Sequence, residues 1–178
     1  MAAYRTASLR RDAITQSSVL NLLLRNYLEY NLFDQADKLV SNIGDASEIA
    51  SSSNQHARFL YYTGRIKAIQ LEYSEASKRL SEALRKAPQN TCLGFRRTTQ
   101  KLLCIVQLLT GEIPEISVFR QNGMKSALAP YFELTKAVRV GDLVAFQEAV
   151  RTYRDSFVAD QTFTLIQRYA PSHTMLEC

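Results

Sequence analysis

The sequence has few of the residues that build metal sites and disulfide frameworks. Its 178 residues include three cysteines and two histidines, and the cysteines form no close-spaced motif. A four-ligand zinc site would have to be assembled from distant positions, so we expect no metal. Free thiols in a reducing compartment are the simpler interpretation of Cys92, Cys104 and Cys178. We expect the protein in the cytoplasm and the nucleus.

Glycine is also scarce, and long hydrophobic runs are missing. The six glycines are scattered and form neither a G-x-G-x-x-G nor a Walker pattern, so we expect no nucleotide or other cofactor. The most apolar stretch, residues 102–109, is far shorter than the about 20 residues that cross a bilayer. Residues 1–11 lack the apolar core of a secretory signal. We therefore expect no membrane partner and no small-molecule substrate.

The sequence is moderately basic, which is weak support for a nucleic-acid-binding protein. The net charge is +5, and basic pairs occur at positions 10–11, 78–79, 85–86 and 96–97. Each pair lies at a helix edge or junction and is interrupted by acidic residues, which favours solvated faces over nucleic-acid binding. A basic helical repeat that binds nucleic acid remains the alternative hypothesis, and a basic patch that meets an acidic partner protein is also compatible with the pattern.

The sequence gives little support for a catalytic site. Glu72 and Glu75, like Glu112 and Glu115, are spaced as carboxylate pairs, but they lie among polar residues rather than in a recognisable cleft. His56 follows a serine-rich stretch that lacks the rigid elbow a nucleophile needs. We expect no enzymatic activity and no catalytic residue.

Hydrophobic periodicity predicts an all-helical chain. No alternating strand pattern of useful length occurs, and apolar residues recur at helical spacing in many segments. Residues 44–55, rich in Ser, Ala, Asp and Asn, read as a loop, and Pro171 is expected to stop the last helix. The helical stripes cover residues 14–30, 33–43, 59–69, 73–84, 95–109, 128–138, 143–153 and 162–169.

Small residues identify one close helix pair. Gly64 lets a first helix approach a second one, Ala76 and Ala83 keep the second helix thin around Leu80, and Pro88 ends it. Residues 33–41 repeat residues 73–81 at an offset of 40. This pattern resembles the tetratricopeptide repeat (TPR), a stacking helix pair of roughly 34 residues. The expected fold is all-α: a right-handed stack of antiparallel helix pairs, a TPR-like α-solenoid.

Two further features concern helix ends and surface aromatics. Gly141 is expected to close a helix in a left-handed conformation, and Asp142 to cap the next helix through its carboxylate. Tyr61 and Tyr62 cannot both point inward because neighbours on a helix lie about 100° apart. One of this pair, and likewise Tyr30, is a candidate for a concave face that binds a partner helix or extended segment.

Six short segments occur in a specific order along the chain: LLLRNYL (22–28), YYTGRIK (61–67), IQLEY (69–73), LRKAP (84–88), LTGEIP (109–114) and PYFELT (130–135). Together they resemble the family of the third non-ATPase subunit of the proteasome regulatory particle lid. The segment AVRVGDL (137–143) also resembles the helical part of the PCI module, which lid, signalosome and translation-initiation scaffolds share. The resemblance covers residues 6–168.

The resemblance implies a non-catalytic scaffold segment that supports degradation of ubiquitinated proteins through contacts with other lid and base subunits. A scaffold of another PCI complex is an alternative. The implied organisation is an N-terminal extension (1–13), TPR-like repeats (14–121), an incomplete helical part of a PCI domain (122–169) and a non-family tail (170–178). The winged helix of the family is expected to be missing, so the chain reads as truncated. Apolar surface near Phe163, Leu165 and Ile166 would then be exposed and favour self-association.

Overall fold

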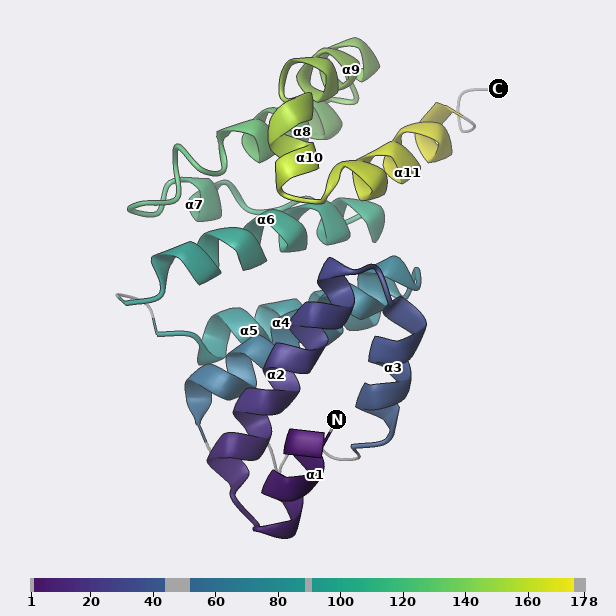
Figure 1. Cartoon of the computed structure of the whole chain (residues 1–178). Coiled ribbons are helices and arrows are strands. Elements are labelled where there is room, and N and C mark those ends of the chain that lie inside the picture. Colours follow the sequence, from purple (N-terminus) through teal and green to yellow (C-terminus); the bar gives the residue numbers. More distant parts are fainter. Residues whose placement is uncertain (1, 44–51, 89–90, 175–178) are drawn as a thin grey trace. The chain divides into compact units, whose positions relative to one another are not determined.

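The structure, a computed structural model, describes residues 2–43, 52–88 and 91–174 (Figure 1). Within those segments every regular element is a helix and none is a strand. The prediction of an all-α fold is confirmed. The chain divides into two compact units, Met1–Cys92 and Leu93–Cys178.

The Met1–Cys92 unit is built around a long second helix. Helix α2 contacts α1, α3 and α4, and α4 pairs with α5 in the most extensive helix–helix contact of the chain. Apolar residues of α2, α3 and α4 share one core, centred on Leu20, Leu24, Leu28, Ala36, Leu39, Phe59 and Ile66. The helices are α1 (Ala2–Leu9), α2 (Ala13–Glu29), α3 (Phe33–Ser41), α4 (Ser53–Ile69) and α5 (Tyr73–Lys86).

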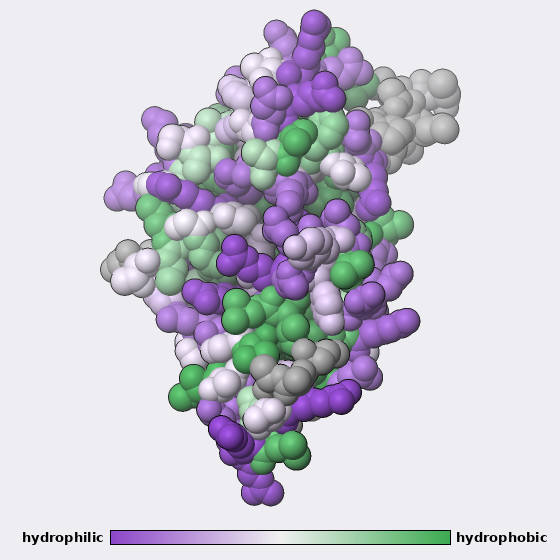
Figure 2. All heavy atoms as spheres, viewed as in Figure 1, coloured by the Kyte–Doolittle hydropathy of each residue, from purple (hydrophilic) through white to green (hydrophobic). Residues whose placement is uncertain are grey.

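Hydrophobic side chains also reach the surface of this unit. Figure 2 shows them gathered over the part of the unit where α2 and α3 lie in Figure 1. Several partly buried residues surround the core there, and they include Leu23, Phe33, Val40 and Ile43. The core of this unit therefore continues into a partly solvated apolar margin.

The turns of both helix pairs have the same geometry at positions 40 residues apart. Asn31 and Leu71 have positive φ angles of 56° and 69°. The next amide donates to the carbonyl five residues earlier in each case: Leu32 N to Tyr27 O at 2.8 Å, and Glu72 N to Lys67 O at 3.0 Å. This is the Schellman arrangement, which fills carbonyls left open at a helix end. The sequence offset of 40 therefore corresponds to a repeated helix–turn–helix unit.

Leu71 is strained in this turn, and relieving the strain should stabilise the chain. A left-handed backbone conformation costs a residue with a β-carbon about 1–2 kcal/mol. Glycine removes this cost, but it also raises the conformational entropy of the unfolded chain, which offsets part of the gain in stability. Leu71 is 57% exposed, so little packing is lost with its side chain. We expect Leu71→Gly to raise the free energy of unfolding by about 0.5–1 kcal/mol, measured by urea denaturation.

Leu22→Gly is the matched control for this prediction. Leu22 is 62% exposed but lies in the middle of α2, where glycine lowers stability by about 1 kcal/mol. Equal destabilisation by the two substitutions would contradict the strain argument.

The described residues of the Leu93–Cys178 unit form one long helix, α6, together with a helix pair and further helices. Helix α6 contacts α8 and α11, α8 pairs with α9, and α10 contacts α11. Pro130 lies in the first turn of α8, a position where proline is favourable. The helices are α6 (Leu93–Leu109), α7 (Ile116–Phe119), α8 (Ala129–Val140), α9 (Leu143–Thr152), α10 (Arg154–Ala159) and α11 (Phe163–Thr174).

Several sequence-based boundaries were wrong. The expected loop 44–55 ends earlier, since α4 begins at Ser53; residues 44–51 lie outside the described part of the chain. The N-terminal extension (1–13) stays a prediction; it contains helix α1, whose Tyr4 hydroxyl accepts a hydrogen bond from Gln16 of α2. Helix α11 does not stop at Pro171 but runs to Thr174. Proline removes one amide donor and crowds the carbonyl four residues earlier, which disfavours a helix without forbidding its last turn.

Candidate interaction surface

The small residues of the α4–α5 pair lie at the contact that the sequence assigned to them. Ala76, Leu80 and Ala83 are completely buried on α5. A β-carbon placed on Gly64 of α4 would lie 2.9 Å from Leu80 Cγ and 3.1 Å from Leu80 Cδ2. Glycine at position 64 is therefore required for this helix spacing. Helix α5 ends at Lys86, two residues before Pro88, and Ala87 is already extended (φ −72°, ψ 132°), as residues before proline prefer.

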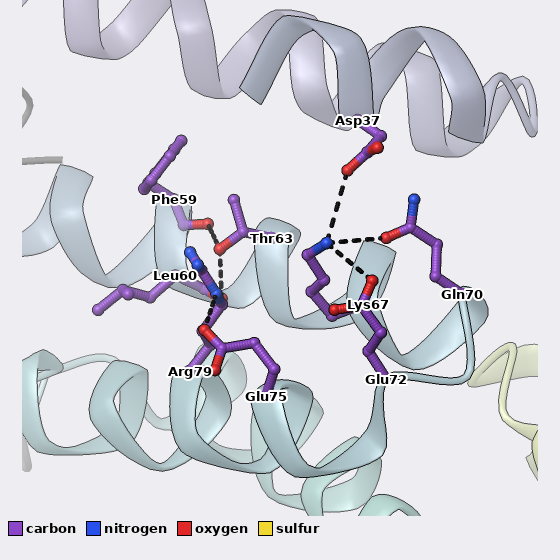
Figure 3. A network of polar contacts seen from close by, with 9 residues as sticks. All are labelled: Asp37, Phe59, Leu60, Thr63, Lys67, Gln70, Glu72, Glu75 and Arg79. Carbon is purple, nitrogen blue, oxygen red and sulfur yellow. Dashed lines mark hydrogen bonds and ion pairs between the residues drawn. The ribbon is translucent and has the colours of Figure 1, made fainter. Parts of the chain in front are cut away.

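Lys67 connects three elements of this unit, as Figure 3 shows. Its Nζ donates to Gln70 Oε1 at 3.1 Å and to Glu72 Oε1 at 3.0 Å, beyond the end of α4. It also lies 3.8 Å from Asp37 Oδ1 of α3. The Lys67 ammonium thus links the α4–α5 turn to helix α3.

The candidate partner-face tyrosines have different surroundings. Tyr30 lies at the C-terminal end of α2 and is 70% exposed. Tyr62 is half-buried and packs against the core of the unit, and burial raises the pKa of its hydroxyl above the usual value. Tyr61 lies beside it, with ring centroids 5.4 Å apart and planes tilted by 60°. Tyr61 and Tyr62 therefore form a pair on α4, while Tyr30 is a separate surface residue on α2.

The second unit contains a polar cluster that the sequence did not indicate. Lys101 Nζ of α6 donates to both carboxylate oxygens of Asp160 at 2.8 Å. The buried Tyr131 hydroxyl of α8 donates to Asp160 Oδ2 at 3.0 Å and lies 2.9 Å from Thr162 Oγ1. Burial raises the pKa of Tyr131 far above its usual value, so the phenol stays protonated as a donor. The cluster ties α6, α8 and the α10–α11 turn together.

We expect the charges of Lys101 and Asp160 to be energetically coupled. Both side chains are about one-fifth exposed, so water reduces the attraction between the two charges but does not abolish it. Asp160→Asn and Lys101→Met should each lower the free energy of unfolding by about 1–3 kcal/mol. The double variant should lose clearly less than the sum, because neither charge is then left unpartnered. A double-mutant cycle in urea denaturation measures this, and additive losses would contradict the coupling.

Gly141 and Asp142 form the turn between α8 and α9. Gly141 is left-handed (φ 75°, ψ 22°), and nothing lies within 4 Å of a β-carbon placed on it, so the backbone conformation alone favours glycine there. Asp142 Oδ1 accepts a hydrogen bond from Ala145 N at 2.9 Å at the start of α9. Both residues serve the fold and neither forms part of a chemical site.

Three groups that could take part in chemistry, Glu72, Glu75 and Cys104, are hydrogen-bonded to cations or kept protonated. Glu72 and Glu75 each accept a hydrogen bond from a cation, Lys67 and Arg79 respectively, at 3.0 Å. Burial raises the pKa of Cys104 to about 12, so it remains a thiol rather than a thiolate nucleophile. In residues 2–43, 52–88 and 91–174 we find no group of three potential metal ligands. None of the described helices is long and apolar enough to span a membrane.

One premise of the sequence analysis was wrong. Leu165 and Ile166, expected to be exposed, are 5% and 1% exposed. They lie on α11, which packs on α6 and α10. Only Phe163 is partly accessible, and the Arg154 guanidinium lies 5.5 Å from its ring centroid. This end of the unit therefore offers little of the apolar surface on which self-association was predicted.

Comparison with known proteins assigns the helical repeats. Residues 1–135 match the model of the PSMD3-like family, N-terminal TPR repeats. The chain belongs to this family. The 26S proteasome non-ATPase regulatory subunit 3 of Dictyostelium discoideum is 60% identical over 168 residues, which are 94% of this chain. The probable subunit 3 of Drosophila melanogaster is 54% identical, and homolog A of Arabidopsis thaliana 50% identical, each over 94% of this chain.

Family membership confirms the resemblance and the TPR-like solenoid class. The chain spans about a third of the length of these relatives: 33% of the Dictyostelium and Drosophila proteins and 34% of the Arabidopsis protein. The PSMD3-like repeat model ends within α8, whereas the sequence analysis placed the end of the repeats at residue 121. The assignment of residues 122–169 to a PCI domain stays a prediction.

Proposed function

We propose that this chain is a non-catalytic interaction segment of the proteasome regulatory particle lid. In this role it contacts other lid and base subunits, and through them it supports the degradation of ubiquitinated proteins in the cytoplasm and the nucleus. The supporting observation is the match of residues 1–135 to the N-terminal TPR repeats of the PSMD3-like family. Stacked helical repeats leave an extended surface that binds other proteins.

The polar contacts of the described residues support this role, because they hold helices together. Lys67 and Lys101 are used in holding helices together, and the carboxylates that resembled catalytic pairs are partnered or solvated. The exposed apolar residues of the first unit, such as Leu22, Tyr30 and Leu71, lie on helix α2 and at a helix turn. Exposed side chains on a rigid helical frame suit protein–protein contact.

Affinity capture from cell lysate tests the proposal. The tagged chain is purified, its helical content is checked by circular dichroism, and captured proteins are identified by mass spectrometry. We expect regulatory-particle subunits to be enriched over a capture with an unrelated TPR protein of similar charge. A folded chain that captures no regulatory-particle subunit would contradict the proposal.

A further inference from the structure

Helices α2 and α4 carry arginines and almost no acids. Helix α4 has Arg58 and Arg65 but no Asp or Glu at any of its 17 positions. Helix α2 has Arg25 and one acid, Glu29, at its last position. One acid on each neighbouring helix is engaged elsewhere: Asp37 of α3 lies near Lys67, and Glu75 of α5 is bonded to Arg79. Helix α4 therefore carries an excess of positive charge, and α2, whose single arginine and single acid balance, places Arg25 on its surface.

Helical spacing aligns the two arginines of α4 with Tyr62. Arg58, Tyr62 and Arg65 are four and three residues apart, so they form one stripe along the helix. Both arginine positions are within one turn of the tyrosine. Tyr62 and Arg65 are half-buried, Tyr62 against the core of the unit, and Arg58 is exposed.

The packing of α2 on α4 adds Arg25 to this stripe. Asn21 Nδ2 of α2 donates to the carbonyl of Gln55 at 2.9 Å and to its side-chain oxygen at 2.8 Å. Arg25 lies one turn after Asn21, and Arg58 lies one turn after Gln55. The charges of Arg25, Arg58 and Arg65 each lower the pKa of Tyr62, although burial raises it more. Three guanidinium groups thus lie within electrostatic range of one protonated phenol.

Arg25 and Arg58 do not take part in the ion pairs that hold the described helices together. Arg25 and Arg58 are exposed, and neither forms an ion pair with any residue that the structure describes. Lys67, Arg79 and Lys101, in contrast, all bind carboxylates. An anion that binds Arg25 or Arg58 would supply the charge-assisted partner that neither arginine has among the described residues.

We propose that Arg25, Arg58, Arg65 and the Tyr62 hydroxyl bind the phosphate of a phosphoserine or phosphothreonine in an extended segment of a partner protein. The proposal rests on the proposed function, because it names the ligand class of the interaction surface. A phosphate monoester carries nearly two negative charges and three acceptor oxygens, and arginine binds it through paired hydrogen bonds. Donors from two helices and a phenol match this group better than a carboxylate, which has one charge and two oxygens.

The surface next to Arg25 supplies contacts for residues that flank the phosphate. A shallow groove with a volume of about 600 Å³ runs along α2 and is lined by apolar residues, by Arg25 and Asn26, and at its end by the acid Glu29 and by Tyr30. Leu22 and Tyr30 are 62% and 70% exposed. Aliphatic residues beside the phosphorylated residue can cover these side chains, which would favour a peptide over free phosphate.

Three peptides with one sequence test the proposal. Each has leucines on both sides of a central phosphoserine, glutamate or serine, and is titrated into the isotope-labelled chain while arginine Nε and backbone amide signals are followed. We expect the phosphoserine peptide to bind with a dissociation constant of about 100 μM or tighter, at least ten-fold tighter than the glutamate peptide. The affected signals should belong to α2 and α4.

Single substitutions test which residues bind the phosphate. Arg25→Gln and Arg58→Gln should each weaken binding of the phosphoserine peptide about ten-fold, the loss expected for one charge-assisted hydrogen bond, and Tyr62→Phe should weaken it a few-fold. Arg85→Gln is the matched control, because Arg85 is an exposed cation on α5. Circular dichroism confirms that each variant keeps its helical content.

Several results would overturn the proposal. These are equal affinity for the phosphoserine and glutamate peptides, equal weakening by Arg85→Gln, or complete displacement of the peptide by a single-stranded RNA of equal concentration. Affinity capture separates this proposal from the proposed function. If the chain captures regulatory-particle subunits but binds no phosphoserine peptide, only the phosphate site is wrong. If it binds the peptide but captures none of them, only the lid assignment is wrong.

Discussion

Ala76→Glu is expected to unfold the α4–α5 helix pair. Ala76 is completely buried on α5, so the new side chain would have to displace neighbours and bring a carboxylate out of water. Overpacking costs about 1–3 kcal/mol, and a buried polar group without partners costs about 1–3 kcal/mol more. The sum is a large part of the stability of an ordinary domain, which is about 5–15 kcal/mol. Ala83→Glu should act in the same way, because Ala83 is equally buried.

Thermal unfolding followed by circular dichroism measures this effect. One kcal/mol corresponds to about 2–4 °C in the melting temperature of a chain of this size, so the midpoint should fall by about 5–20 °C. Ser74→Glu is the matched control, since it adds the same charge to an exposed position in the first turn of α5. An acid near a helix N-terminus is tolerated or favourable. Unchanged melting of both alanine variants would show that α5 does not face α4 as described.

Gly64→Leu should destabilise the same helix pair from the other side. A β-carbon alone would lie 2.9 Å from Leu80 Cγ and 3.4 Å from Arg79 Cβ. Leu80 is completely buried and cannot swing into solvent, so the helices must separate. We expect a loss of about 3 kcal/mol in the free energy of unfolding, measured by urea denaturation.

Two comparisons isolate the steric cause at Gly64. Gly94→Leu places the same residue on α6, where nothing lies within 4 Å of the added β-carbon, and it should leave stability unchanged or raise it by up to about 1 kcal/mol, because leucine favours helix over glycine. Gly64→Ala should become stabilising in a Leu80→Ala background, because the space is then free and alanine favours helix by about 1 kcal/mol over glycine. Equal effects of Gly64→Leu and Gly94→Leu would rule out close packing at position 64.

The two large predictions share one cause. The α4–α5 contact has no spare volume at Gly64, Ala76 or Ala83, and tightly packed interiors respond to added atoms by moving whole elements. A rigid helix pair also fixes the stripe that carries Arg58, Tyr62 and Arg65. Destabilising this contact should therefore weaken phosphopeptide binding as well as folding, whereas Arg25→Gln and Arg58→Gln should weaken binding alone.

Short helices were missed by the sequence analysis for a simple reason. Helices α7 and α10 have four and six residues, which is too short for a hydrophobic period to repeat. Helix α1 was also missed, because only Ala7 of its described side chains is buried. Longer helices such as α2 and α5 repeat the period several times and were predicted within a few residues of their bounds.

The sequence by itself determined the local features of this protein. Apolar periodicity placed the long helices, Gly141 and Asp142 marked a turn, and Gly64, Ala76 and Ala83 marked a close helix contact, because these effects act over a few neighbouring residues. The tertiary structure alone decided the pairing of Lys101 with Asp160, 59 positions apart, the burial of Leu165 and Ile166, and the hydrogen bonds from Asn21 of α2 to Gln55 of α4. These depend on which helices pack together, and charge or hydrophobicity in one segment carries no information about its distant neighbours.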